Sequence, residues 1–171
     1  LAGIISDTGR FKRASPEAFA AASELLAAGG FDYEEALEAL FLPPDLSQRI
    51  AVLKAASRSK FERQGDWLVA WTIVNSFEGS ACMALKEMGA DVALVAGRHG
   101  GKVRISGRSS REAARRGLNL AEVLSRTAKE FGGEGGGHRS AAAMEAAGDP
   151  AAILDACRKK VASSLLWEPE L

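Results

Sequence analysis

The sequence has few of the residues that mark several common classes of protein. Among 171 residues it contains two cysteines, two histidines and one tyrosine. Cys82 and Cys157 lack Cys-x-x-Cys spacing, which argues against a disulfide framework or a thiolate zinc site. We therefore expect both thiols to be small buried side chains. No apolar run reaches the roughly 18 to 20 residues of a membrane-spanning helix, so we expect a cytoplasmic protein without a membrane partner.

The chain also lacks net charge, because 22 Lys and Arg balance 22 Asp and Glu. A neutral protein is poorly suited to wrapping a long nucleic acid, which usually requires a broad basic surface. The positive charge is nevertheless uneven. Residues 98–116 contain seven Lys and Arg and one acid, Glu112.

Strand patterns alternate with helix patterns, which predicts an α/β fold. We expect a strand in the apolar run 1–6, another over 67–75, and a hairpin over 91–110 that turns at Gly100-Gly101. The predicted helices span 15–30, 32–41, 78–90, 118–131, 138–148 and 151–167. We expect the tail of an α/β domain over 1–42, a helical connector over 43–65 and a smaller mixed-sheet α/β domain over 66–171. The chain begins within a predicted core strand, so we expect it to be part of a larger protein.

The stretch "FGGEGGGHRSAAAM", residues 131–144, places glycines directly before His138 and an alanine-rich segment with helical propensity. Glycine allows close approach of the backbone to a ligand, and free N–H groups at a helix start attract phosphate. His138 can donate a hydrogen bond to the same oxygens. The pattern also fits a flexible loop with a helix-capping histidine.

The stretch "ISGRSS", residues 105–110, ends a predicted strand with Arg108, Ser109 and Ser110. Arginine offers a planar fork of donors to phosphate, and neighbouring hydroxyls add further donors. We expect Arg108 to bind an anion. The more distant Arg111, Arg115 and Arg116 fit an exposed helix face.

The stretch "SDTG", residues 6–9, follows the first apolar run. A carboxylate at the carboxyl end of a core strand lies where ligands bind in α/β sheets, so Asp7 is a candidate ligand of a hard divalent cation. A turn-forming aspartate is the commoner explanation of this pattern.

Taken together and in this order, "LAGIISDTGRF", "ISGRSS" and "GGEGGGHRSAAAM" resemble the DHH phosphoesterase family with its C-terminal DHH-associated domain. The resemblance implies that Asp7 binds Mn²⁺ in a two-metal catalytic centre. It also implies that the substrate is bound by Arg108, Ser109, Gly135, Gly136, Gly137 and His138. The Asp-His-His triplet that names the family is absent from the chain, and Ala143 occupies a position where the family usually has glycine.

The implied function is the C-terminal part of a manganese-dependent phosphoesterase that hydrolyses short oligonucleotides or small nucleotides. The alternative is a non-catalytic nucleic-acid-binding module like the domain that ends alanyl-tRNA synthetases. A third possibility is a regulator that binds a nucleotide without chemistry.

Overall fold

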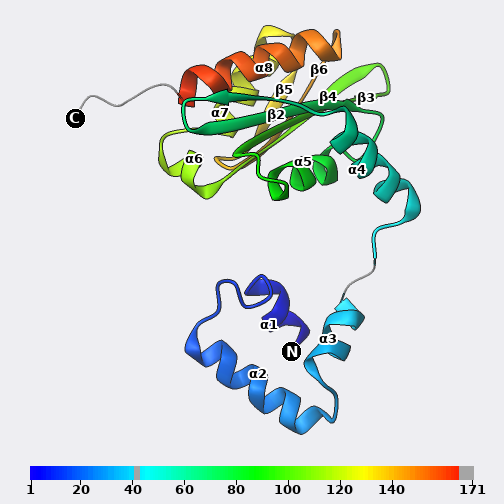
Figure 1. The fold of residues 1–171 in the computed structure, drawn as a ribbon, viewed down its shortest axis with the longest axis vertical. Helices are drawn as coiled ribbons and strands as arrows, with labels where there is room; N and C mark the ends of the chain where they lie inside the picture. The colour runs from blue at the N-terminus through cyan, green and yellow to red at the C-terminus, as the bar shows by residue number, and fades with distance from the viewer. Residues whose placement is uncertain (41–42, 166–171) are drawn as a thin grey trace, which may run out of the picture. The chain divides into compact units, whose positions relative to one another are not determined.

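The computed structural model describes residues 1–40 and 43–165, and the chain divides into two compact units. Unit 1 is Leu1–Pro44 and unit 2 is Asp45–Leu171 (Figure 1). The segment predicted as a connector, 43–65, falls mostly within unit 2. None of the helices in the described ranges combines the length and apolar composition that crossing a bilayer needs.

The regular elements in the described residues of unit 1 are all helices, namely α1 (Ala2–Asp7), α2 (Pro16–Gly29) and α3 (Tyr33–Leu40). The predicted caps are present. The Ser15 hydroxyl accepts a hydrogen bond from the Ala18 amide, and Gly30 ends α2 with a φ of 64°. Asp32 and Glu35 form a reciprocal capping box, with N···O distances of 2.8 and 2.9 Å. These caps fix the ends of α2 and the start of α3.

The predicted strand over residues 1–6 is wrong, because this run forms α1. A strand satisfies its backbone groups only beside another strand, and the described part of unit 1 contains none. A helix pairs the same groups internally, and Thr8 closes it by donating its hydroxyl to the Ile4 carbonyl at 2.6 Å. Asp7 is consequently the last residue of a short helix and does not follow a core strand.

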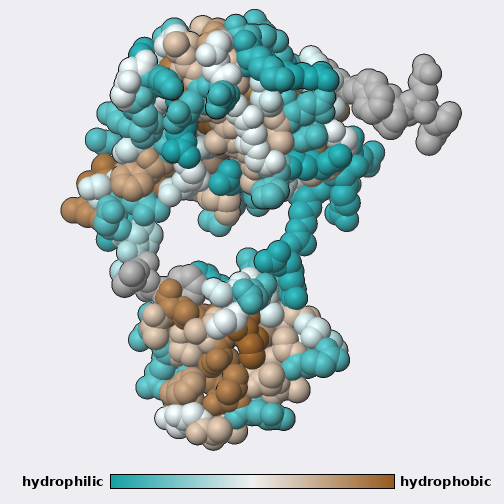
Figure 2. Space-filling view, turned by 180° about the vertical axis from the view of Figure 1, so that it is seen from behind, coloured by the Kyte–Doolittle hydropathy of each residue, from teal (hydrophilic) through white to brown (hydrophobic). Residues whose placement is uncertain are grey.

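Unit 1 buries little apolar surface within itself. Among its described residues, Ile5 and Ala22 are buried, whereas Phe19, Leu25 and Phe31 are exposed. Figure 2 shows the resulting hydrophobic surface over this unit. A core this small contributes little hydrophobic stabilisation, so most of the stabilising burial in the chain belongs to unit 2.

Unit 2 is built on a six-stranded mixed sheet with the strand order β1-β2-β3-β4-β6-β5. Strands β2 and β3 are parallel and joined through α5, while all other neighbours are antiparallel. This confirms the predicted α/β class with a mixed sheet. The strands are β1 (Lys60–Gln64), β2 (Trp67–Val74), β3 (Val92–His99), β4 (Lys102–Ser109), β5 (Glu134–His138) and β6 (Ala141–Ala146).

Helices cover both faces of this sheet (Figure 1). They are α4 (Leu46–Arg58), α5 (Glu78–Glu87), α6 (Arg111–Arg115), α7 (Leu120–Glu130) and α8 (Pro150–Leu165). Helices α7 and α8 cover a large core that includes Leu94, Ile105 and Met144. On the other face, α4 and α5 cover a smaller core that includes Val95 and Cys82. The prediction that both cysteines are buried is confirmed.

Two elements of unit 2 differ from the sequence prediction. Residues 138–148 were expected to form a helix, yet they contain the turn Arg139-Ser140 and the central strand β6. Alanine favours helix in isolation, but here β4 and β5 pair with both edges of the segment, and tertiary pairing overrides propensity. Within the predicted connector, residues 60–64 form the edge strand β1, which turns at Gly65 with a φ of 61°.

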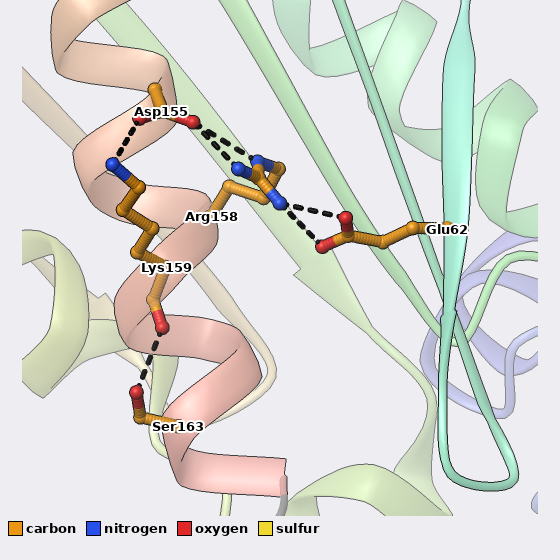
Figure 3. Close-up of polar contacts among 5 residues, drawn as sticks. All are labelled: Glu62, Asp155, Arg158, Lys159 and Ser163. Carbon is orange, nitrogen blue, oxygen red and sulfur yellow. Dashed lines mark hydrogen bonds and ion pairs between the residues drawn. The ribbon is translucent and has the colours of Figure 1, made fainter.

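The edge strand β1 is fastened to α8 by one arginine (Figure 3). The Arg158 guanidinium donates to both Glu62 carboxylate oxygens at 2.7 Å and to Asp155 at 2.7 Å. It also lies 5.1 Å from the centre of the Trp71 ring. Hydrogen bonds to Asp155 and Glu62 raise the pKa of Arg158, so the charge that holds β1 in place persists throughout the physiological pH range.

Candidate functional site

Within the described residues of unit 2, no helix makes extensive contact with one face of the sheet over β6 and β5, which we call the uncovered face. Helices α4 and α5 pack against β2, β3 and β4, whereas the main helical contacts of β5 and β6 come from α7 on the opposite face. The register sets out three rows of side chains across the uncovered face, because directly paired residues point to the same side. The rows are Arg108–Ala141–His138, Ser106–Ala143–Gly136 and Arg104–Glu145–Glu134.

The first row brings together two residues that the sequence singled out. Arg108 on β4 and His138 on β5 both pair with Ala141 on the strand between them. Two strand spacings put their Cα atoms about 10 Å apart, and Ala141 leaves room between the two side chains. Arg108 donates to the neighbouring Gly107 carbonyl at 2.9 Å, and neither residue forms an ion pair with a described residue. The row thus puts two side chains that can donate hydrogen bonds on the same side of the sheet.

The turn between β5 and β6 holds this row in position. The Ser140 carbonyl accepts from the Ser109 amide at 3.0 Å, and the Arg139 carbonyl accepts from the Leu120 amide at 2.9 Å. One bond ties the turn to the end of β4 and the other ties it to the start of α7. The donors therefore come from β4 and β5, two strands whose relative positions are fixed by backbone hydrogen bonds.

The predicted helix start at His138 does not exist, so the expected phosphate site at a helix N-terminus is wrong. His138 ends β5, an edge strand, and its side chain is exposed. Glycines in an edge strand leave its outer backbone groups accessible to a ligand. Approach of a ligand to the backbone, which the sequence suggested, therefore stays a prediction, now for an edge strand in place of a helix start.

The three glycines before His138 differ in what a side chain at each position would meet. A Cβ at Gly135 would lie 2.8 Å from the Met144 Cβ, on the face covered by α7. Gly137 has a φ of 139°, and a Cβ there would lie 2.6 Å from the Ala141 carbonyl oxygen. A Cβ at Gly136 meets nothing within 4 Å. Gly136 is therefore the one whose missing side chain leaves open space on the face of Arg108 and His138.

The three serines of "ISGRSS" also differ in the face of the sheet on which they lie and in their hydrogen bonds. Ser109 is buried on the opposite face of the sheet from Arg108, and its hydroxyl has no hydrogen-bond partner among the described residues. The Ser110 hydroxyl caps α6 by accepting from the Ala113 amide at 3.1 Å. Ser106 lies on the same face as Arg108 and is 5% exposed. Only Ser106 is placed to take part in a site with Arg108 and His138.

Helix α5 packs on β3 and β4, on the same face of the sheet as Arg108 and His138, and so borders the uncovered area. The Cys82 thiol donates to the Ser106 carbonyl at 3.0 Å, and burial raises its pKa to about 12, so it stays protonated at neutral pH. His99 lies 2.7 Å from the carboxylate of the buried Glu78. That carboxylate occupies the space where a Cβ of Gly97 would be. These contacts seat α5 closely against the sheet.

The basic stretch 98–116 does not form one patch. Arg115 and Arg116 pair with Glu112 on the exposed side of α6, as the alternative from the sequence predicts. Arg98 pairs with Asp149 at 3.8 Å. Arg104 and Arg108 are the arginines of this stretch that point to the uncovered face.

The described residues show no cluster of metal-binding side chains. Asp7 is an exposed residue at the end of α1, and the ranges 1–40 and 43–165 contain no group of three or more His, Cys, Asp or Glu that could hold a metal ion. Asp7 belongs to unit 1, whereas Arg108 and His138 belong to unit 2. Manganese binding by this chain stays an untested expectation.

Sequence reasoning missed Glu134 and Glu145. Both are exposed, lie in one row with Arg104 and line a shallow hollow together with Gly135, Ala143 and Met144. They were hidden because Glu134 sat in a predicted loop and Glu145 in a predicted helix. The sequence carried little signal, because alanines on both faces of β6 hide the period-two burial that puts Glu145 opposite Ala142, Met144 and Ala146.

Comparison with known proteins supports the family resemblance. The model of the DHHA1 domain matches residues 69–163. An uncharacterized protein of Methanocaldococcus jannaschii, MJ0988, is 30% identical over 163 residues, covering 94% of this chain and 49% of that protein. The chain thus spans about half the length of this curated relative.

Solved structures share the fold. An exopolyphosphatase-related protein from Bacteroides fragilis matches 95% of this chain and 48% of its own chain, with 18% identity and a TM-score of 0.67. The C-Ala domain of Aquifex aeolicus alanyl-tRNA synthetase matches 62% of this chain and 97% of its own, with 24% identity and a TM-score of 0.49, which is too low to bear on function. The resemblance predicted from the sequence is confirmed by the domain match, which covers more than half of the residues: the chain belongs to the DHHA1 domain family.

Proposed function

We propose that this chain supplies the substrate-binding part of a DHH-family phosphoesterase that acts on short oligonucleotides or small nucleotides. The observation that carries the proposal is the row Arg108–Ala141–His138, where two donors without ion-pair partners flank a small residue on an uncovered face. An arginine and an imidazole can both donate to the oxygens of one phosphate. The zero net charge of the chain supports a small substrate over a long polymer.

Catalysis, in this proposal, needs a metal centre whose remaining ligands lie outside these 171 residues. Manganese there would activate water and neutralise charge on the phosphorus oxygens. The residues of this chain contribute binding and orientation. Arg108 and His138 hold a phosphate in place, and the rigid backbone of β4 and β5 keeps both donors in register.

Changing either Arg108 or His138 to Ala is expected to weaken binding of the 5′-phosphorylated dinucleotide pApA by about 1 to 3 kcal/mol, because each change removes a charge-assisted or neutral hydrogen bond to phosphate. Isothermal titration calorimetry on the chain measures this loss. Arg111→Ala is the matched control, since it removes an equal charge from an exposed position on α6. Equal losses of affinity in all three variants would mean that only net charge matters. Unchanged affinity in the Arg108 and His138 variants would contradict the proposed site.

A non-catalytic nucleic-acid-binding module is the second candidate. The 171-residue chain alone is expected to show no manganese-dependent hydrolysis of pApA under either proposal. The full-length protein is expected to hydrolyse pApA with Mn²⁺ and to lose this activity on chelation, as measured by chromatography of the products. Tight binding without turnover by the full-length protein would favour the second candidate, and turnover by the chain alone would contradict both.

A further inference from the structure

The third row of the uncovered face carries three charged side chains with no protein partner. Arg104, Glu145 and Glu134 are exposed and point to the same side, and none forms an ion pair or a side-chain hydrogen bond with another described residue. Many other charged residues of unit 2 do pair, such as Arg126 with Glu122 and Lys160 with Glu130. All three charged residues line the shallow hollow over β4, β6 and β5.

The middle row supplies an independent observation. Ser106 is 5% exposed and lies between the two charged rows, and its hydroxyl is not one of the fully buried, unpartnered side-chain groups of the described chain, which are those of Thr72 and Ser109. Its row neighbours, Ala143 and Gly136, are small, and Gly136 has open space above it. The side chains of the middle row are therefore short, and the Ser106 hydroxyl is the polar side-chain group among them.

The spacing of the rows matches the parts of a nucleotide. Successive rows are two residues apart along each strand, which is about 7 Å, so the outer rows are about 13 Å apart. A bare phosphate cannot bridge this distance, whereas one nucleotide can reach both rows. A phosphate on Arg108 and His138 would put the sugar over the floor beside the Ser106 hydroxyl. The base would then lie over Arg104, Glu145 and Glu134.

We propose that this third row selects guanine. This inference rests on the proposed function, since it places the phosphate on the first row. Arginine donates two hydrogen bonds to the O6 and N7 acceptors of guanine. A carboxylate accepts from the adjacent N1–H and N2–H groups on the neighbouring edge. Adenine offers no such pair of acceptors to Arg104 and no such pair of donors to Glu145, and a site built to bond a missing group rejects the analogue strongly.

The test compares 5′-GMP, 5′-IMP and 5′-AMP binding to the chain by isothermal titration calorimetry. GMP is expected to bind at least tenfold more tightly than AMP. IMP, which lacks the N2 amino group, is expected to lose most of that advantage. Glu145→Gln is expected to lower GMP affinity to the level of AMP and to leave AMP affinity unchanged. Glu122→Gln, on α7, is the matched control and is expected to retain the preference for GMP.

Failures of the two proposals are distinguishable in this experiment. Equal affinities for GMP and AMP, both lost in His138→Ala, would leave the phosphate row standing and overturn the guanine inference. A preference for GMP that survives Glu145→Gln would also overturn the role of this carboxylate. If neither nucleotide binds, the phosphate row and the inference built on it fall together.

Discussion

Replacing Gly137 with Val is expected to lower the free energy of unfolding of unit 2 by about 2 to 5 kcal/mol, the sum of backbone strain and overpacking. Gly137 has a φ of 139°, which a β-branched residue rarely adopts. A Cβ there would lie 2.6 Å from the Ala141 carbonyl oxygen and 2.7 Å from the Ala142 Cα. Because both are backbone atoms, the pairing of β5 with β6 must open to accommodate the side chain.

Urea unfolding followed by tryptophan fluorescence measures this loss, since Trp67 and Trp71 lie in β2 of unit 2. The matched control is Gly136→Val, one residue earlier, where a Cβ meets nothing within 4 Å. We expect its unfolding free energy to stay within about 1 kcal/mol of the original chain, since Val suits a strand. Gly136→Val is nevertheless expected to abolish nucleotide binding by filling the floor of the uncovered face. A Gly137→Val variant as stable as the original chain would contradict the close approach of backbone at this position.

The sequence alone does not distinguish Gly135, Gly136 and Gly137 from one another. The resemblance identifies "GGGH" as one binding segment. Only the strand register separates Gly136, which leaves space for a ligand, from Gly135 and Gly137, which leave space for protein atoms. Register depends on which strands become neighbours, and β6 was not recognised as a strand. Arg108 and His138 could therefore be predicted as site residues, but their common row could not.

The elements that sequence predicts correctly are those whose local and tertiary preferences agree. Strand β2 is a long run of β-branched and aromatic residues, and α2 carries its own cap at Ser15 and its own stop at Gly30. Strand β6 is rich in alanine, whose propensity favours helix and whose uniform small size hides the alternation of burial. The segment 1–6 failed for the opposite reason, because an apolar run of six fits a strand or a helix and the available neighbours decide. In both cases the deciding contacts come from elsewhere in the chain.

Replacing Leu124 with Ala is expected to destabilise unit 2 by about 3 to 4 kcal/mol, as typical for a large-to-small change in a closed core. Leu124 lies on α7 and is fully buried. A Cβ at Gly107 would be 3.3 Å from its Cδ1 atom, and a Cβ at Gly135 would be 3.1 Å from its carbonyl oxygen. Helix α7 thus approaches β4 and β5 closely at two of their glycines, Gly107 and Gly135, so the vacated volume cannot collapse easily.

Leu53→Ala on α4 is the control, because the same atoms are removed from a side chain that is 71% exposed, and a change within about 0.5 kcal/mol is expected there. The comparison uses urea unfolding with tryptophan fluorescence, and similar losses in both variants would contradict the packing of α7 on the sheet. Leu124 lies under the face opposite Arg108 and His138, so it has no contact with a nucleotide in the proposed site. The Leu124→Ala change is therefore expected to affect nucleotide binding only by disturbing the strands. At urea concentrations well below the unfolding midpoint, its nucleotide affinity should fall less than that of the His138→Ala variant. A Leu124→Ala variant that stays folded yet binds no nucleotide would mean that the alignment of Arg108 with His138 depends on α7 as well as on the strand pairing.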